Sequence, residues 1–333
     1  MGQQRQIWAD SLKGILILLV VLGHAIQGVY TDNVENSRLW CIKYSFHMPA
    51  FFAISGYFVK YAGIRRQVYT SILKRVQQLL VPYFIWAILK LILIGEVNVS
   101  SLTSIITDPV SFWFLWVLFV VYLLFQFSLF LYVKSKRQFN YESMIMAVAL
   151  IGMMAVFNTK LFGYHLISYY FAFYAIGYYM GQYRLLSIKS KLELGVFATI
   201  WFFMAWNWSM HELPSWMPVI PYIPSSIVQL AYRFITAFVA IILLQNIAPM
   251  LLVSTGKVNS VCAKLGFYSL GIYTTHYLII WSIADGIVKL SKNSEVSVLM
   301  TVVIATVLSL ALVWLLNINK YTSALFLGKI NRA

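Results

Sequence analysis

Three polar residues occur in an otherwise apolar stretch near the N-terminus, and their spacing predicts a shared function. Residues 10–24 read DSLKGILILLVVLGH, with Asp10, Lys13 and His24 as the ionisable groups. On an α-helix the interval from Lys13 to His24 is almost three whole turns, so both side chains project from one face about 16 Å apart. Asp10 lies three residues before Lys13, within pairing distance. Because an imidazole can act as base and then as acid near neutral pH, His24 is a candidate catalytic residue.

Each of these residues also has a structural interpretation. Charged side chains inside a membrane helix cost about 2.5–3.5 kcal/mol on insertion scales, which makes them functional hypotheses by default. Lys13 can nevertheless extend its ammonium group to the membrane surface. His24 can serve only as a hydrogen-bond partner of a neighbouring helix. Position alone does not decide between these alternatives.

Two further histidines lie in apolar contexts. His47 belongs to SFHMPAFFAISGYF and His276 to FYSLGIYTTH. On the topology derived below, all five histidines of the chain fall in the outer half of the membrane or just beyond it, which indicates a polar cavity that opens outward. His165 and His211 are interpreted as interfacial, whereas His47 and His276 are either substrate-binding or structural.

Several kinds of chemistry lack support in the sequence. It contains no HExxH motif, no paired cysteines, no GxSxG elbow and no P-loop. No metal is therefore expected, and a soluble-hydrolase triad is unsupported. Cys41 and Cys262 are predicted on opposite sides of the membrane, so no disulfide is expected. Proton transfer by a histidine inside a membrane cavity is the chemistry that the sequence still supports.

The elements that must position these residues are membrane helices. Of the 333 residues, 61% are hydrophobic and only 11% are charged, far from the roughly 25% charged residues of soluble domains. Apolar stretches long enough to cross a bilayer recur along the chain. They lie near residues 12–30, 42–60, 78–95, 112–133, 143–158, 163–182, 194–210, 226–247, 265–285 and 297–319. The predicted fold is all-α, a polytopic membrane protein of about ten transmembrane helices, with residues 1–333 forming a single membrane domain and no additional soluble domain.

The chain has a net charge of +15, and its basic residues are distributed as this topology predicts. With the N-terminus in the cytoplasm, most Lys and Arg residues fall in cytoplasmic joints, as the positive-inside rule requires. Both termini are therefore predicted to be cytoplasmic, and no nucleic-acid partner is expected. The first stretch lacks a cleavage site and is interpreted as a retained helix. The predicted location is integral to the plasma (inner) membrane, with several passes.

A basic segment joins the second and third stretches and reads KYAGIRRQVYTSILKRVQQLLVPY. Its residues Lys74 and Arg75 run directly into the apolar helix, where a guanidinium could bind a phosphate at the membrane face. The preference of Lys and Arg for cytoplasmic joints explains part of this positive charge. Anionic lipid headgroups are an alternative to a substrate phosphate as the ligand of these residues. Arg233, in the outer half of the eighth stretch, is assigned a functional or ion-pairing role. The aromatic run SFWFLWVLF belongs mainly to the membrane interface and core, although some of its rings could stack on a sugar.

Five of these segments together resemble the acyltransferase 3 family of integral membrane acyltransferases. Residues 10–24 resemble the opening motif, with Lys13 where Arg is more usual, and 46–58 resemble the second-helix signature of the branch related to fucose 4-O-acetylases. Residues 74–83 are similar to a basic RRxxR segment before Pro-Tyr, but the third basic position is Gln78. FWFL at 112–115 and YSLGIYTTH at 268–276 complete the pattern.

The resemblance implies transfer of an acyl group, usually acetyl from cytoplasmic acetyl-CoA, to a hydroxyl of a cell-surface or lipid-linked glycan. It implies that His24 is the general base or a transient acyl carrier, and that Lys13 paired with Asp10 holds the donor or gates its entry. The implied CoA-phosphate ligands are Arg65, Arg66, Lys74 and Arg75. The implied acceptor-binding residues are His47, Arg233, Trp113, Tyr268, Ser269 and His276. Of these, His47, His276 and Arg233 could either orient the acceptor or stabilise the oxyanion that forms during transfer. The expected partners are the glycan acceptor, acyl-CoA, membrane lipid and a glycan-synthesis machinery.

Two other functions stay open. A histidine-lined cavity with a cationic inner mouth also fits an exporter of a polysaccharide or lipid-linked glycan. Such transporters often contain inverted repeats and matching broken helices, and neither is found in this sequence. A membrane scaffold in a glycan-synthesis complex is the third function, and it predicts that His24 matters only for folding.

Overall fold

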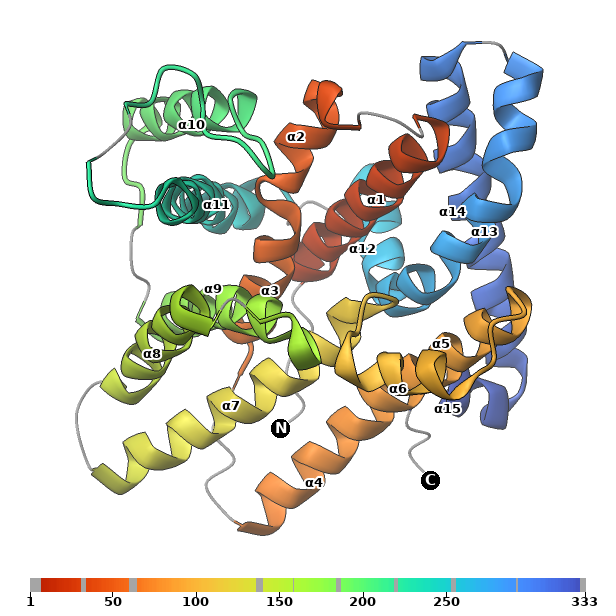
Figure 1. Cartoon of the computed structure of the whole chain (residues 1–333), viewed down its shortest axis with the longest axis horizontal. Helices are drawn as coiled ribbons and strands as arrows, with labels where there is room; N and C mark the ends of the chain where they lie inside the picture. The colour runs from red at the N-terminus through yellow and green to blue at the C-terminus, as the bar shows by residue number, and fades with distance from the viewer. Residues whose placement is uncertain are drawn as a thin grey trace. The chain divides into compact units, whose positions relative to one another are not determined.

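The computed structural model describes residues 7–30, 34–59, 65–135, 140–157, 159–183, 187–218, 221–252, 256–291 and 293–329 (Figure 1). Helices connected by short turns make up these residues, and no strand occurs among them. The predicted all-α class is confirmed. The helices are α1 (Ile7–Val29), η1 (Val34–Asn36), α2 (Arg38–Tyr44), α3 (His47–Tyr57), α4 (Arg65–Arg75), η2 (Val76–Leu80), α5 (Val81–Leu93), α6 (Val99–Thr107), α7 (Trp113–Ser135), α8 (Tyr141–Phe157), η3 (Leu161–Gly163), α9 (Tyr164–Tyr183), α10 (Lys191–Trp206), α11 (Ser225–Leu251), α12 (Lys257–Phe267), α13 (Ser269–Ser291), α14 (Ser294–Ile318) and α15 (Lys320–Leu327).

Within the described ranges, five helical segments are long and apolar enough to cross a membrane. They are Ile7–Val29, Gln67–Leu93, Trp113–Ser135, Ser225–Leu251 and Ser294–Ile318. Each of the ten apolar stretches overlaps at least one helix. The count of about ten transmembrane helices and the cytoplasmic position of both termini stay predictions.

The second apolar stretch, residues 42–60, does not form one continuous helix. The chain turns at Ser45 and Phe46, which separate α2 from α3. Pro49 explains this break, because a proline ring in a helix collides with the carbonyl of the fourth preceding residue, here Ser45, and has no N–H to bond it. The Ser45 hydroxyl donates instead to the Ile42 carbonyl at 2.7 Å. The break sets the directions of Lys43 and His47.

A π-helical segment, η2, joins α4 to α5. The Val81 N–H donates to the Val76 carbonyl, five residues back, and Pro82 follows immediately. A π-turn at this point accommodates the proline without ending the helix. The basic residues of α4 are therefore continuous with an apolar membrane helix, as the sequence predicts for Lys74 and Arg75.

The chain divides into two compact units. Unit 1 contains residues 1–54 and 183–310, and unit 2 contains residues 55–182 and 311–333. The prediction of one domain over the whole chain stays a prediction.

Unit 1 is built around α1, which lies against α2, α12 and α13 (Figure 1). The backbones of α1 and α12 touch at two glycines. A Cβ atom on Gly14 would lie 1.9 Å from the Cys262 carbonyl oxygen, and one on Gly266 would lie 1.8 Å from the Asp10 carbonyl oxygen. Small residues permit this close approach of helices in membranes. The Ser11 hydroxyl also donates to the Asn259 carbonyl at 3.2 Å, so α1 has a fixed position on α12.

Unit 2 contains α5, α7 and α15 with the basic helix α4. The Gln77 side chain donates to the Ala324 carbonyl at 2.7 Å, and the Trp86 indole donates to the Phe326 carbonyl at 2.9 Å. Gly328 ends α15 at a positive φ of 61°, a conformation that glycine adopts without steric cost. These contacts hold η2, and with it the end of α4, against α15.

Candidate active site

His24 lies near the C-terminal end of α1 and contacts two rings of α13. Its ring centroid is 5.1 Å from that of His276 and 5.3 Å from that of Tyr277. The His24 Nδ1 atom is buried and has no hydrogen-bond partner in the described part of the chain. α1 is continuous from Lys13 to His24, so the two residues lie on one face of the helix, as their spacing predicts. The structure thus joins two motifs about 250 residues apart in sequence.

Two other imidazoles, His47 and His276, are tied to backbone carbonyls. His47 Nδ1 lies 2.7 Å from the Lys43 carbonyl oxygen, and His276 Nδ1 lies 2.8 Å from the Ile272 carbonyl oxygen. A carbonyl only accepts, so Nδ1 carries the proton in both rings, and in a neutral ring Nε2 is then left as an acceptor. His276 Nε2 is buried with no hydrogen-bond partner within the described ranges. These rings are buried, at 2% and 1% exposure, and both are held in fixed orientations.

Lys43 occupies the space beside His24, which sequence reasoning did not foresee. Its side chain is 2% exposed. A Cβ atom added to Gly23 would lie 1.5 Å from Lys43 Nζ, so the ammonium group fills the position that a side chain at residue 23 would take. Lys43 lies close enough to interact electrostatically with all three imidazoles of the cluster, and its Nζ lies 3.6 Å from the Tyr44 ring centroid. From here on, His24, Lys43, His47 and His276 are called the imidazole cluster.

The sequence contains a signal that could have identified Lys43. It precedes His47 by four residues, the spacing at which side chains share a helix face, and it lies on the predicted outer side, where lysine is uncommon. Lys43 is not among the site residues predicted from the sequence. Its contact with Gly23 depends on packing between α1 and α2, and no sequence spacing expresses that contact.

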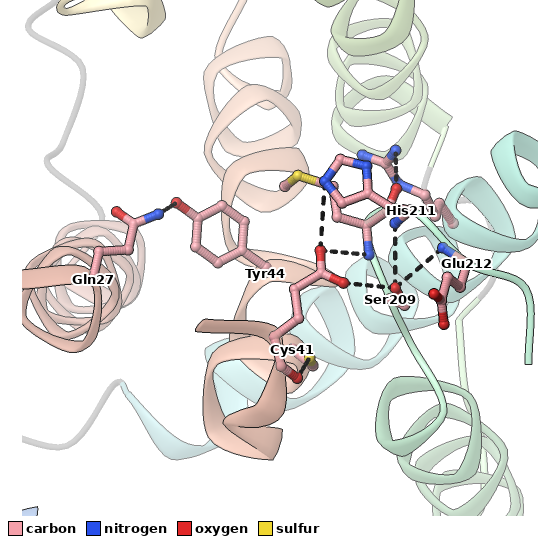
Figure 2. A network of polar contacts seen from close by, with 9 residues as sticks. Gln27, Cys41, Tyr44, Ser209, His211 and Glu212 are labelled. Atoms are coloured by element: carbon pink, nitrogen blue, oxygen red, sulfur yellow. Dashed lines mark hydrogen bonds and ion pairs between the residues drawn. The ribbon is translucent and has the colours of Figure 1, made fainter. Parts of the chain in front are cut away.

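Polar and aromatic side chains continue outward from the cluster. The Gln27 amide donates to the Tyr44 hydroxyl at 3.4 Å (Figure 2). Gln27 also interacts with His24. Tyr44 meets His47 edge to face at 5.0 Å and stacks on Trp40 at 4.0 Å. Tyr44 therefore connects the imidazoles to a row of rings formed by Tyr44, Trp40 and Trp208, which we call the aromatic row.

Arg233 lies at the far end of this aromatic row. Its guanidinium is 5.5 Å from the Trp208 ring centroid, and Trp208 is 6.3 Å from Trp40. Arg233 Nη1 also donates to the Met210 carbonyl at 3.4 Å. The indole N–H groups of Trp40 and Trp208 are buried without a partner among the described residues. Arg233 is thus linked to the imidazole cluster through a row of rings.

A carboxylate from η1 fixes the loop that carries Trp208. Glu35 accepts from the Ser209 hydroxyl at 2.8 Å and from the Met210 N–H at 3.3 Å. The Ser209 hydroxyl in turn accepts from the backbone N–H groups of His211 and Glu212, both at 3.2 Å (Figure 2). His211 is exposed, 3.8 Å from Glu35. We call this network the Glu35 clasp.

The remaining predicted residues of unit 1 lie at the other end of α1 and at the start of α13. Asp10 and Lys13 are partly buried in the first two turns of α1. Tyr268 ends α12, and Ser269 begins α13 two turns before His276. Their roles stay predictions.

In unit 2, Arg75 is the best-positioned of the predicted phosphate ligands. Its Nη1 donates to Gln78 Oε1 at 3.2 Å, and its guanidinium lies 5.3 Å from the Tyr122 ring centroid. Gln78, which replaces the third basic residue of the motif, therefore orients Arg75. Lys74 is exposed.

Three other predicted residues belong to unit 2. Arg65 and Arg66 begin α4, and their side chains lie outside the described part. Trp113 begins α7 and stacks on Tyr170 at 5.3 Å. A search of the described ranges finds no group of three His, Cys, Asp or Glu residues able to hold a metal ion.

Comparison with known proteins identifies the family. The model of the acyltransferase 3 family, described as an acyltransferase domain, matches residues 6–318. The chain belongs to the acyltransferase 3 family. The resemblance drawn from the five motifs is therefore confirmed, and the five long apolar helices of the described residues indicate a membrane protein.

Two curated relatives have the same printed name. The chain is 31% identical over 191 residues to nodulation protein NolL of Sinorhizobium fredii, a match that covers 54% of this chain and 50% of that protein. It is also 31% identical over 188 residues to nodulation protein NolL of Mesorhizobium japonicum, which covers 54% of this chain and 48% of that protein. The matched part is thus about half the length of these relatives. No solved structure matches the chain.

Proposed function

We propose that this acyltransferase is a multi-pass plasma-membrane O-acetyltransferase that transfers acetyl from cytoplasmic acetyl-CoA to a hydroxyl of a cell-surface or lipid-linked glycan. The observation that carries the proposal is the imidazole cluster, in which His24 of the first family motif lies 5.1 Å from His276 of the last. Acyl transfer to a hydroxyl requires a base, and a histidine is suited to that task. Membrane lipid and a glycan-synthesis machinery are the further proposed partners.

His24 is the proposed catalytic base. It takes the proton of the acceptor hydroxyl as the hydroxyl oxygen attacks the thioester carbonyl carbon. The alternative role is a transient acyl carrier, in which the His24 ring itself becomes acylated before the glycan accepts the group. Its buried Nδ1 without a described partner supports either role, because a catalytic nitrogen must be available to a substrate.

The donor and acceptor are assigned to different residues. The proposed ligands of the CoA phosphates are Arg65, Arg66, Lys74 and Arg75, and the ordered guanidinium of Arg75 supports this role. Asp10 and Lys13 hold the donor or gate its entry. The acceptor is assigned to His47, Arg233, Trp113, Tyr268, Ser269 and His276. The aromatic row with its unpartnered indole N–H groups supports a sugar ligand, because it offers flat faces and hydrogen-bond donors together.

The test measures transfer of labelled acetyl. Membranes containing the wild type, His24→Ala or His165→Ala at equal protein levels are given acetyl-CoA labelled in the acetyl group, together with the host's surface glycan. His165 is the matched control, since it is a partly buried histidine of α9 outside the proposed site. We expect label in the glycan with the wild type and with His165→Ala, and none with His24→Ala.

The other outcomes separate the alternatives. Equal labelling by His24→Ala would remove His24 from the mechanism. Wild-type label on the protein itself, released by hydroxylamine and absent in His24→Ala, would assign the acyl-carrier role. Glycan that crosses the membrane without receiving label would favour the exporter.

A further inference from the structure

The buried ammonium group of Lys43 needs a functional explanation. Transferring a charged group from water to a protein interior is costly unless it is paired. Lys43 is 2% exposed, and it is one of the largest fully buried side chains of the described residues. Neutral alternatives of similar length, such as methionine, would fill the same volume without that cost. A lysine kept at this buried position, where methionine would fill the same volume, indicates that the site uses its amino group.

The position of the ammonium is set by a glycine. Nζ lies 1.5 Å from the place where a Cβ of Gly23 would be, and Cε lies 2.3 Å from it. Any other residue at position 23 would displace the lysine head. Because Gly23 immediately precedes His24, the ammonium group is held beside the proposed base.

The described side chains that surround Lys43 include no carboxylate. His24 and Gln27 of α1, Tyr44 and His47 around the α2–α3 turn, and His276 and Tyr277 of α13 are the groups that meet in this region. These side chains are imidazoles, phenols and an amide. The Lys43 carbonyl also accepts from His47 Nδ1, which fixes the backbone at the lysine. A positive charge that is already ordered requires no reorganisation when negative charge develops nearby.

We propose that Lys43 is a catalytic residue whose ammonium group stabilises the oxyanion of the acyl carbonyl during transfer, and this rests on the proposed function. The acceptor oxygen forms a bond to the acyl carbon while His24 takes the hydroxyl proton, and the carbonyl oxygen becomes an oxyanion beside Lys43 Nζ. The carbon–sulfur bond then breaks, the carbonyl re-forms, and the proton on His24 passes to the CoA thiolate. The products are the ester and CoA with a free thiol.

Lys13 does not fill this role. It lies on the same face of α1 as His24 but about 16 Å away along the helix axis. His47 and His276 use their Nδ1 protons on backbone carbonyls, so in their neutral forms they offer an acceptor, not a donor, to the site. Among the described residues, Lys43 is the basic side chain that lies against Gly23, the residue before His24.

The test uses the full-length protein purified in detergent, a soluble glycan acceptor and acetyl-CoA. Lys43→Met removes the charge at similar length, and Lys43→Arg retains it. We expect kcat to fall by about 10²–10³ in Lys43→Met, the loss typical of removing one oxyanion donor. The KM for acetyl-CoA is expected to stay within about threefold, and Lys43→Arg is expected to recover part of kcat.

A second donor distinguishes catalysis from structural support. Acetyl-dithio-CoA has sulfur in place of the carbonyl oxygen and is a poorer acceptor for an ammonium group. The replacement should slow the wild type more than Lys43→Met, so the two changes should be non-additive. A merely structural role for Lys43 would give equal slowing in both proteins.

Gly23→Ala is the variant to use if Lys43→Met fails to fold. The three atoms nearest the added methyl group all belong to the flexible end of the lysine, so α1 is expected to keep its backbone while the amino group moves away. We expect at least a tenfold loss of kcat with unchanged thermal unfolding. Folded Lys43→Met or Gly23→Ala with wild-type kcat would overturn the inference. No transfer by the wild type would instead reject the proposed function, and the inference with it.

Discussion

The contact between α1 and α12 leads to a quantitative prediction for Gly14→Ala. The added Cβ would lie 1.9 Å from the Cys262 carbonyl oxygen. Non-bonded atoms pack best at about 3.5 Å, so α12 would have to retreat by roughly 1.6 Å. The obstacle is backbone, which cannot rotate away as a side chain can. Overpacking of this kind costs about 1–3 kcal/mol, and occasionally more.

Gly195→Ala is the matched control. Gly195 also lies within a helix, α10, but a Cβ added there meets no atom within 4 Å. Replacing glycine by alanine favours a helix by about 0.5–1 kcal/mol in both variants. The difference between the two variants therefore isolates the clash, and we expect Gly14→Ala to be less stable than Gly195→Ala by about 1–3 kcal/mol.

The assay is equilibrium unfolding of the purified variants in mixed micelles at increasing SDS fraction, followed by tryptophan fluorescence. The slope of the transition should be the same in the two variants, so that midpoints report stability. Equal midpoints for Gly14→Ala and Gly195→Ala would refute the backbone contact between α1 and α12. The positions of His24 and His276 would then need a different explanation.

Three further predictions concern other parts of the molecule. Arg75→Ala should raise the KM for acetyl-CoA at least tenfold. Gln78→Ala removes the acceptor that orients Arg75 and should raise this KM by a smaller factor. An unchanged KM in both variants would remove Arg75 and Gln78 from donor binding. Glu35→Ala opens the Glu35 clasp and should speed proteolysis in the loop after Trp208, with Glu212→Ala as the control, and equal cleavage would contradict the clasp. Burial and the Glu35 carboxylate raise the pKa of the Cys41 thiol, so less thiolate exists at a given pH than in the unfolded chain. Its alkylation in the folded protein should therefore keep accelerating above pH 9, and a plateau at the same pH as in SDS-denatured protein would contradict this.

The sequence by itself determined the helical class and the order of the motifs. A composition with few charges and recurrent apolar stretches requires helices, because an isolated backbone in lipid must bond within its own segment. The shared face of Lys13 and His24 also follows from sequence, since 3.6 residues per turn fix it within one helix. The family could be identified for the same reason, because its motifs are local and linear.

Pro49 is an intermediate case. The sequence contained the reason for the break between α2 and α3, because a proline at that position excludes a continuous helix. A long apolar run was nevertheless interpreted as one segment from 42 to 60. Mean hydropathy depends only on residue types. It therefore does not detect a turn within a run that stays apolar.

Only the tertiary structure decided which residues surround His24. Its contact with His276 joins helices that are distant in the chain, and the place of Lys43 depends on the absence of a side chain at Gly23. Contacts of this kind arise from packing between helices, whereas sequence periodicity describes only the faces of single helices. The sequence thus determined the chemistry carried by each helix, and packing determined which of those groups meet.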